Sequence, residues 1–232
     1  MGSFRLVIFD NDGVLVDSEP LAAEAMSEVL TSLGLALSPE QCDALFRGSA
    51  LQRTRALAED RFGGPLPAGF EGLYSARLIE LMQARLRPVH GVEAVLDQLD
   101  AAGIAYCVAS SGRRQRIGFA LETAGLAQRF AGRWWGEEDA PEGKPAPDLF
   151  QKAAAEMGVE PGDCVVIEDS KVGVQAARTA GMAVFGFAAA TPPESLAGAE
   201  RIFTDMTELP ALLLGGWRPD GPNAGLNDAE RE

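Results

Sequence analysis

The chain has 232 residues, which allows one large domain or a core domain with a modest second one. Its 34 acidic residues outnumber the 20 Lys and Arg, and the formal net charge is −14. Such a surface repels nucleic acid and anionic lipid, so we expect no nucleic-acid partner and no membrane partner. No apolar run approaches the roughly 18 residues that a transmembrane helix needs.

The cysteine and histidine content restricts the chemistry further. Cys42, Cys107 and Cys164 form no CxxC pair, and we interpret them as small buried hydrophobic residues. This content, together with the absence of a recognisable signal peptide, favours a cytoplasmic location. His90 is the only histidine, so zinc sites built from several His are excluded. It lies in a predicted turn, where we expect a structural role.

The chain begins with a buried strand followed by a helical segment. The apolar run at 5–9 predicts the strand, and the interval 18–86 shows no strand pattern. Helical periodicity in this interval predicts helices at 19–33, 39–46, 51–62 and 70–85. Ser38, Pro39 and Gln41 predict a capped start for the second of these helices. We therefore expect an all-helical insert after the first strand.

Beyond the insert, strand-like and helical runs alternate. Strands are predicted at 104–110, 132–136, 164–168, 183–187 and 201–204. Helices are predicted at 91–102, 113–124, 146–157 and 171–180. This alternation indicates an α/β fold with a doubly wound parallel sheet covered on both faces. The segment 215–232 is rich in Gly, Pro and Asn without periodicity, which predicts a disordered tail.

Ligands of parallel α/β sheets bind beyond the carboxyl ends of the strands, so polar residues there are the first candidates for a site. Asp10 and Asp12 directly follow the first strand. A calcium-binding EF-hand is excluded, because Val14, Leu15 and Leu21 occupy positions that need a polar ligand, a Gly and a Glu. For this pair alone, solvated loop acids are the alternative.

Two further segments could bind an anion. Ser110, Ser111 and Arg113 stand between a strand and a helix, where hydroxyl and amide groups bind anions well. A simple helix N-cap is the alternative for the serines. Lys144 lies in a Gly-Pro loop before another helix, where an ordinary surface charge is the alternative.

A fourth strand end carries Glu168 and Asp169, whose oxygen atoms would suit Mg²⁺. A helix N-cap acid is the alternative. Taken together, the four strand ends or adjoining loops would supply two acid pairs, a hydroxyl and a cation to one site.

These four segments resemble the signatures of the haloacid dehalogenase-like (HAD) hydrolases, over residues 4–210. The segments read "VIFDNDGV", "CVASSG", "GKPAPDLF" and "VVIEDSKVGVQAARTAGM", in the order that the family shows. The insert resembles the helical cap of the phosphoglycolate phosphatase and β-phosphoglucomutase branch. The resemblance implies a Rossmann-like catalytic core at 1–17 and 87–214 and a cap at 18–86.

The resemblance also implies catalytic roles. Asp10 would attack a phosphomonoester to form an aspartyl phosphate, and Asp12 would protonate the leaving group and then activate water. Ser110, with Ser111, would hold phosphoryl oxygens, and Lys144 would offset their negative charge. The metal would be Mg²⁺.

The implied metal ligands are Asp10, the backbone carbonyl of Asp12, and Asp169, with Glu168 close by. Arg113, Glu19 and Arg47 are further candidate contacts for the substrate, and an ordinary surface role is the alternative for the two cap residues.

Other activities of the family fit less well. A dehalogenase needs neither the second acid at Asp12 nor Mg²⁺. A phosphonatase needs a Lys from the cap, and the interval 18–86 contains none.

β-Phosphoglucomutases are the nearest rival. They carry a His where this chain has Ala22 and an Arg where it has Leu51, although Arg47 or Arg53 could replace the latter. Arg113, by contrast, matches a basic residue of their distal phosphate site. We therefore favour a phosphatase over a mutase.

A non-catalytic binding module on the same fold is a further alternative, but it would have no need of both Asp10 and Asp12. We expect a Mg²⁺-dependent phosphatase that acts on a small phosphorylated metabolite, a sugar or polyol phosphate. We expect it to be a monomer or a weak dimer.

Overall fold

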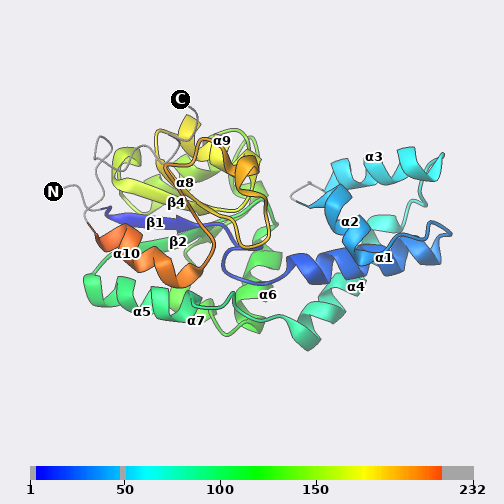
Figure 1. Cartoon of the computed structure of the whole chain (residues 1–232), viewed down its shortest axis with the longest axis horizontal. Helices are drawn as coiled ribbons and strands as arrows, with labels where there is room; N and C mark the ends of the chain where they lie inside the picture. The colour runs from blue at the N-terminus through cyan, green and yellow to red at the C-terminus, as the bar shows by residue number, and fades with distance from the viewer. Residues whose placement is uncertain (1–3, 48–50, 216–232) are drawn as a thin grey trace, which may run out of the picture. The chain divides into compact units, whose positions relative to one another are not determined.

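The computed structural model describes residues 4–47 and 51–215, with side chains from Arg53 onward in the second range. The predicted tail, apart from Gly215, lies outside the described residues. The described residues gather into two compact units (Figure 1). The first unit comprises 4–10, 90–114 and 133–215, and the second comprises 11–47, 51–89 and 115–132. The second unit therefore contains the predicted cap at 18–86, the flanking residues 11–17 and 87–89, and the separate segment 115–132.

A six-stranded sheet forms the centre of the first unit, and all of its strand pairs are parallel (Figure 1). Its strands, in the spatial order β3-β2-β1-β4-β5-β6, are Trp134–Trp135, Ala105–Ala109, Leu6–Phe9, Cys164–Glu168, Ala183–Phe187 and Arg201–Phe203. The strands fall within or match the predicted ranges. The predicted α/β fold with a doubly wound parallel sheet is confirmed.

The strand order places the candidate residues at one edge of the sheet. β1 lies between β2 and β4, and Phe9 is paired with Val108 on one side and with Ile167 on the other. Successive connections therefore run in opposite directions from β1, and the β1/β4 neighbourhood is the topological switch point where such sheets bind ligands. Asp10, Ser110 and Glu168 lie at the carboxyl ends of these three strands.

Helices cover both faces of the sheet. They are α5 (Val92–Ala102), α8 (Asp148–Glu156), α9 (Lys171–Thr179) and α10 (Leu209–Leu214). Figure 1 shows α8 and α9 on one face and α5 and α10 on the other. Alternate strand residues such as Ile8 and Val166 pack with Phe150 and Ala177 in one buried core, as the two-residue period of a strand requires. The short helix α10 was not predicted from the sequence.

The second unit is mainly helical. Its helices are α1 (Glu19–Ser32), α2 (Pro39–Phe46), α3 (Leu51–Phe62), α4 (Phe70–Arg85), α6 (Arg114–Thr123, from its second residue) and α7 (Ala127–Phe130). Between 18 and 86 the described residues form helices and loops only, so the predicted all-helical insert is confirmed. Ser38 and Gln41 form the predicted capping box at the start of α2. Among the described helices, none is long and apolar enough to cross a membrane.

Candidate active site

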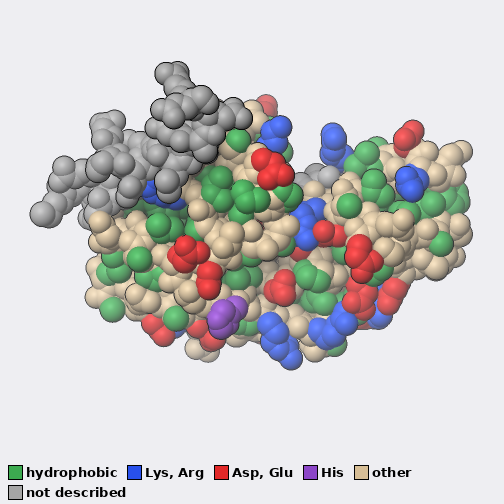
Figure 2. Space-filling model, in the orientation of Figure 1, with side chains coloured by type: hydrophobic (Ala, Val, Ile, Leu, Met, Phe, Trp, Pro, Cys, Tyr) green, Lys and Arg blue, Asp and Glu red, His purple; other side chains and the backbone are tan. Residues whose placement is uncertain are grey.

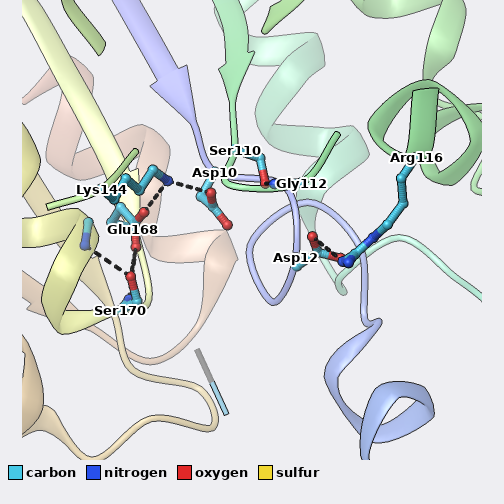
Figure 3. Close-up of polar contacts among 9 residues, drawn as sticks. Asp10, Asp12, Ser110, Gly112, Arg116, Lys144, Glu168 and Ser170 are labelled. Atoms are coloured by element: carbon cyan, nitrogen blue, oxygen red, sulfur yellow. Dashed lines mark hydrogen bonds and ion pairs between the residues drawn. The ribbon is translucent and has the colours of Figure 1, made fainter. Parts of the chain in front are cut away.

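Lys144 is the centre of a buried charge cluster in the first unit. Its Nζ lies 2.6 Å from Oδ1 of Asp10 and 2.5 Å from Oε1 of Glu168 (Figure 3). All three side chains are almost fully buried, at 2%, 10% and 1% exposure. Burial by itself would lower the pKa of Lys144, but the two carboxylates raise it above its ordinary value. Lys144 is therefore a buried cation, and the alternative of a surface charge is excluded.

Glu168 is held by both of its carboxylate oxygens. Oε1 accepts from Lys144, while Oε2 accepts from the backbone N–H of Ser170 at 2.9 Å and from its hydroxyl at 2.8 Å. Ser170 also caps α9, accepting from the N–H of Gly173. A Cβ at Gly173 would lie 1.9 Å from the Glu168 carboxyl carbon, so only glycine leaves room for this acid. The local order of α9 thus fixes Glu168, and Glu168 in turn orients Lys144.

The donor set of the first unit fits a magnesium ion in its chemistry. Asp10 follows β1 and Asp169 follows β4, so two carboxylates stand at the ends of neighbouring strands. Among the described residues, no three His, Cys, Asp or Glu side chains are grouped to hold a metal by themselves. Mg²⁺ does not need such a group, because it is usually bound through one or two carboxylates together with water and substrate phosphate. Asp10 and Asp169 supply that number.

The segment after β2 is arranged around Ser110. Ser110 is buried, and its Oγ accepts from the N–H of Gly112 at 3.3 Å (Figure 3). Ser111 is exposed. The Arg113 side chain is 80% exposed and forms an ion pair with Glu137 at 3.1 Å. Of the three predicted anion contacts, only Ser110 is buried at the strand end.

Asp12 belongs to the second unit and is bound by two residues there. Its Oδ1 accepts from the Ser18 hydroxyl at 2.6 Å. Its Oδ2 lies 2.6 Å from the Arg116 guanidinium (Figure 3). Burial would raise the pKa of Asp12, but Arg116 and Ser18 lower it overall. The structure therefore holds Asp12 as a carboxylate.

Arg116 was missed by the sequence analysis. It comes from the first turn of α6, three residues after the candidate Arg113, and belongs to none of the four motifs. Asp12, more than 100 positions earlier in the chain, raises the pKa of Arg116 above its ordinary value. Two residues so far apart in the chain share no local sequence pattern, so the sequence alone did not indicate this ion pair.

The two predicted cap contacts lie in the same unit as Asp12. Glu19 begins α1, and burial followed by the charge of Asp12 raises its pKa. Arg47 follows α2 and forms an ion pair with Asp43 at 2.6 Å. Leu51 begins α3, but its side chain lies outside the described parts of the chain.

Histidine and cysteine chemistry is not supported by the structure. The sole histidine, His90, lies exposed on the surface (Figure 2). Cys42, Cys107 and Cys164 are buried as free thiols, as predicted. The polar side chains that form the candidate site are therefore carboxylates, Lys144, Arg116 and Ser110.

Comparison with known proteins identifies the class. The sequence profile of the haloacid dehalogenase-like hydrolases matches residues 4–181, well over half of the chain. The chain belongs to this family, and it is a HAD-like phosphatase.

Individual relatives match three quarters or more of this chain. 6-Phosphogluconate phosphatase of Escherichia coli (strain K12) is 29% identical over 220 residues, or 94% of this chain and 98% of that protein. Fructose-1-phosphate phosphatase of the same strain is 34% identical over 195 residues, or 76% and 92% of the two chains. The solved structure of a HAD family hydrolase from Deinococcus radiodurans R1, with bound phosphate and sodium, has 31% identity and a TM-score of 0.80, covering 93% and 97% of the two chains. The relatives thus include phosphatases of sugar phosphates.

Proposed function

We propose that this protein hydrolyses the phosphomonoester of a small sugar or polyol phosphate through an aspartyl-phosphate intermediate, with Mg²⁺ as cofactor. The observation that carries the proposal is the buried contact between Lys144 and Asp10, 2.6 Å long, at the carboxyl end of β1. A phosphomonoester is an anion and is repelled by a carboxylate nucleophile unless cations stand beside it. Lys144 supplies such a cation at the attacking group.

In the proposed reaction Asp10 is the nucleophile. One of its carboxylate oxygens bonds to phosphorus while the bond from phosphorus to the leaving oxygen breaks. Asp12 follows two residues later in the chain. When substrate binds, its carboxylate takes up a proton from solvent and donates that proton to the leaving oxygen. In the second half, the Asp12 carboxylate takes a proton from a water molecule that attacks the aspartyl phosphate. Phosphate leaves and Asp10 is regenerated.

Ser110 and Lys144 bind and orient in this scheme. In the proposed reaction the Ser110 hydroxyl donates to a phosphoryl oxygen, as would the amides that follow it. Glu168 and Ser170 keep the Lys144 ammonium beside Asp10. Mg²⁺, when bound by Asp10, Asp169 and the Asp12 carbonyl, would supply further positive charge beside the phosphoryl group. Direct metal binding by Glu168 and phosphate binding by Ser111 and Arg113 stay predictions, as do a cytoplasmic location and a monomer or weak dimer.

The nucleophile can be tested with Asp10→Asn. In assays of phosphate release from sugar and polyol phosphates with Mg²⁺, we expect this variant to lose activity by at least about 1,000-fold. Asp60→Asn, which changes an exposed acid on α3, should keep the wild-type rate. Addition of EDTA to the wild type should abolish phosphate release, and excess Mg²⁺ should restore it.

Three outcomes would contradict the proposal. Activity that survives Asp10→Asn would exclude Asp10 as the nucleophile. Isomerisation of a hexose phosphate without net phosphate release would show a mutase. No turnover with any phosphomonoester in the presence of Mg²⁺ would favour a non-catalytic module.

A further inference from the structure

The second unit contains a polar cluster around Asp12, formed by Glu19, Arg47, Tyr74 and Arg116. Arg116 touches Asp12 directly, and both Glu19 and the neutral Tyr74 lie near enough to Arg116 to interact with it electrostatically. The charges of Arg47 and Arg116 act in turn on Glu19. All four side chains are half-buried, so they are partly open to solvent. These residues come from α1, the end of α2, α4 and α6, and only the fold brings them together.

Two hydrogen-bond donors of this cluster are unused. The Nη1 group of Arg47 and the Nε group of Arg116 are both buried, and neither has a hydrogen-bond partner among the described residues. Buried donors without partners are rare in native proteins because they lose their hydrogen bonds to water. A ligand oxygen that accepted from either N–H group would supply the hydrogen bond that it lacks.

Both cations of the cluster are already paired with acids. Arg47 is paired with Asp43 at 2.6 Å, and Arg116 is paired with Asp12 at 2.6 Å. Glu19 adds a third acid against these two cations. A ligand carboxylate would therefore meet no surplus positive charge, and it would be repelled by an ionised Glu19. Neutral hydroxyl groups, by contrast, can accept from the arginine N–H groups and donate to the acid.

The position of the cluster indicates which part of a substrate it would contact. Under the proposed function, on which this inference rests, Asp12 protonates the leaving oxygen. The leaving group must then lie against Asp12 and beside the side chains that surround it. We infer that Glu19, Arg47, Tyr74 and Arg116 bind the hydroxyl groups of a neutral polyol or sugar leaving group and discriminate against one that carries a carboxylate.

A pair of substrates with one difference tests the inference. Glucitol 6-phosphate and 6-phosphogluconate share a carbon skeleton and differ only at C1, which is an alcohol in the first and a carboxylate in the second. We expect the wild-type kcat/KM for phosphate release to be at least about tenfold higher for glucitol 6-phosphate. A ratio of one or below would overturn the inference while leaving the phosphatase itself established.

Two variants on α1 test whether Glu19 causes the preference for glucitol 6-phosphate over 6-phosphogluconate. Glu19→Gln removes the unbalanced acid, so the ratio should fall by about threefold or more through a gain with 6-phosphogluconate. Glu24→Gln makes the same chemical change on α1 but breaks only an ion pair with Arg85, and the ratio should stay at its wild-type value. An unchanged ratio in Glu19→Gln would show that the cluster does not discriminate by charge.

Binding measurements separate this inference from the catalytic proposal. Titration calorimetry with Asp10→Asn and Mg²⁺ measures the affinity for both compounds without turnover. Tighter binding of glucitol 6-phosphate by about tenfold supports the inference, even if no variant hydrolyses either compound. Equal affinity, tighter binding of 6-phosphogluconate, or no binding of either compound would overturn it.

Discussion

At the scale of single residues, the site depends on paired charges that are almost entirely buried. Lys144 contacts Asp10 and Glu168, and its ammonium group lies 4.8 Å from the centre of the Phe150 ring. Removal of one partner from such a cluster leaves the others buried without compensation, which costs more than the intact cluster contributes. Lys144 therefore has a structural role as well as the proposed catalytic one.

Lys144→Met tests both roles. Loss of the ammonium group leaves two buried acids facing each other, so we expect the free energy of unfolding to fall by about 3–5 kcal/mol. Phosphate release should fall by at least about 100-fold. Lys152→Met on α8 removes only an exposed ion pair with Glu156, and it should change stability by less than about 1 kcal/mol. Urea unfolding and phosphate assays measure the two effects, and wild-type stability in Lys144→Met would refute the charge-cluster argument.

Asp12 should contribute to the pH dependence of stability. Its pKa is lowered from the ordinary 3.8, because Arg116 and Ser18 outweigh the effect of burial. The ionised form therefore stabilises the folded state at pH values above the unfolded pKa, and this contribution is lost as the pH falls through the lowered value. We expect the difference in unfolding free energy between wild type and Asp12→Asn to be constant from about pH 7 to 5 and to shrink below about pH 4.

Urea unfolding at several pH values measures this difference, with Asp60→Asn as the exposed control. A difference that grows on acidification would mean that the pKa of Asp12 is raised in the folded protein.

At the scale of elements, the start of α9 illustrates how a helix terminus positions a side chain of the site. Ser170 caps the helix and also donates to Glu168, so one residue orders both. Gly173, the third residue of α9, has no side chain where the Glu168 carboxylate lies. Glycine has a low helix propensity, but at this position its missing side chain leaves room for the Glu168 carboxylate beside β4.

Gly173→Ala should destabilise the protein although alanine favours helices. A Cβ 1.9 Å from the Glu168 carboxyl carbon must displace the acid and disturb Lys144, so we expect a loss of about 1–3 kcal/mol. Gly72 is also the third residue of its helix, α4, but a Cβ there meets nothing within 4 Å. Gly72→Ala should therefore stabilise by about 0.5–1 kcal/mol. Thermal or urea unfolding compares the two variants, and a stabilised Gly173→Ala would contradict the observed crowding.

At the scale of the whole molecule, both units bury cysteine. Cys42 belongs to the second unit, while Cys107 and Cys164 lie in β2 and β4 of the first. Burial raises the pKa of the Cys42 thiol to about 11 and that of Cys164 to about 12. It also raises the pKa of Cys107. The reactive thiolate is therefore scarce near neutral pH in the folded protein.

Iodoacetamide at pH 8 should leave all three thiols unmodified in the native protein and alkylate all three in denaturant. Mass spectrometry of peptides measures each site. Ser75→Cys, which adds a thiol at an exposed position of α4, provides the control for reagent access. In intermediate denaturant, the order in which Cys42 and Cys107 react reports which unit opens first. Rapid native alkylation of either would contradict the burial found in the structure.

Local sequence patterns alone determined the strands of this protein and the polar residues at their ends. The alternation of apolar strands with amphipathic helices predicted the strands, and the polar residues at the strand ends predicted Asp10, Ser110 and Glu168 as neighbours at one edge of a parallel sheet. This was possible because the period of a strand and the signals that end it are encoded within a few adjacent residues. The capping box of Ser38 was predictable for the same reason.

Only the tertiary structure decided how the charges are paired. Lys144 is 134 residues from Asp10, and Arg116 is more than 100 from Asp12. Side chains so far apart in the chain leave no shared pattern, and their contacts follow from strand order and helix packing. The same holds for Gly173, whose necessity depends on a carboxylate that the fold places against it. The local sequence thus determined which groups lie at the strand ends, while long-range packing determined their charge partners.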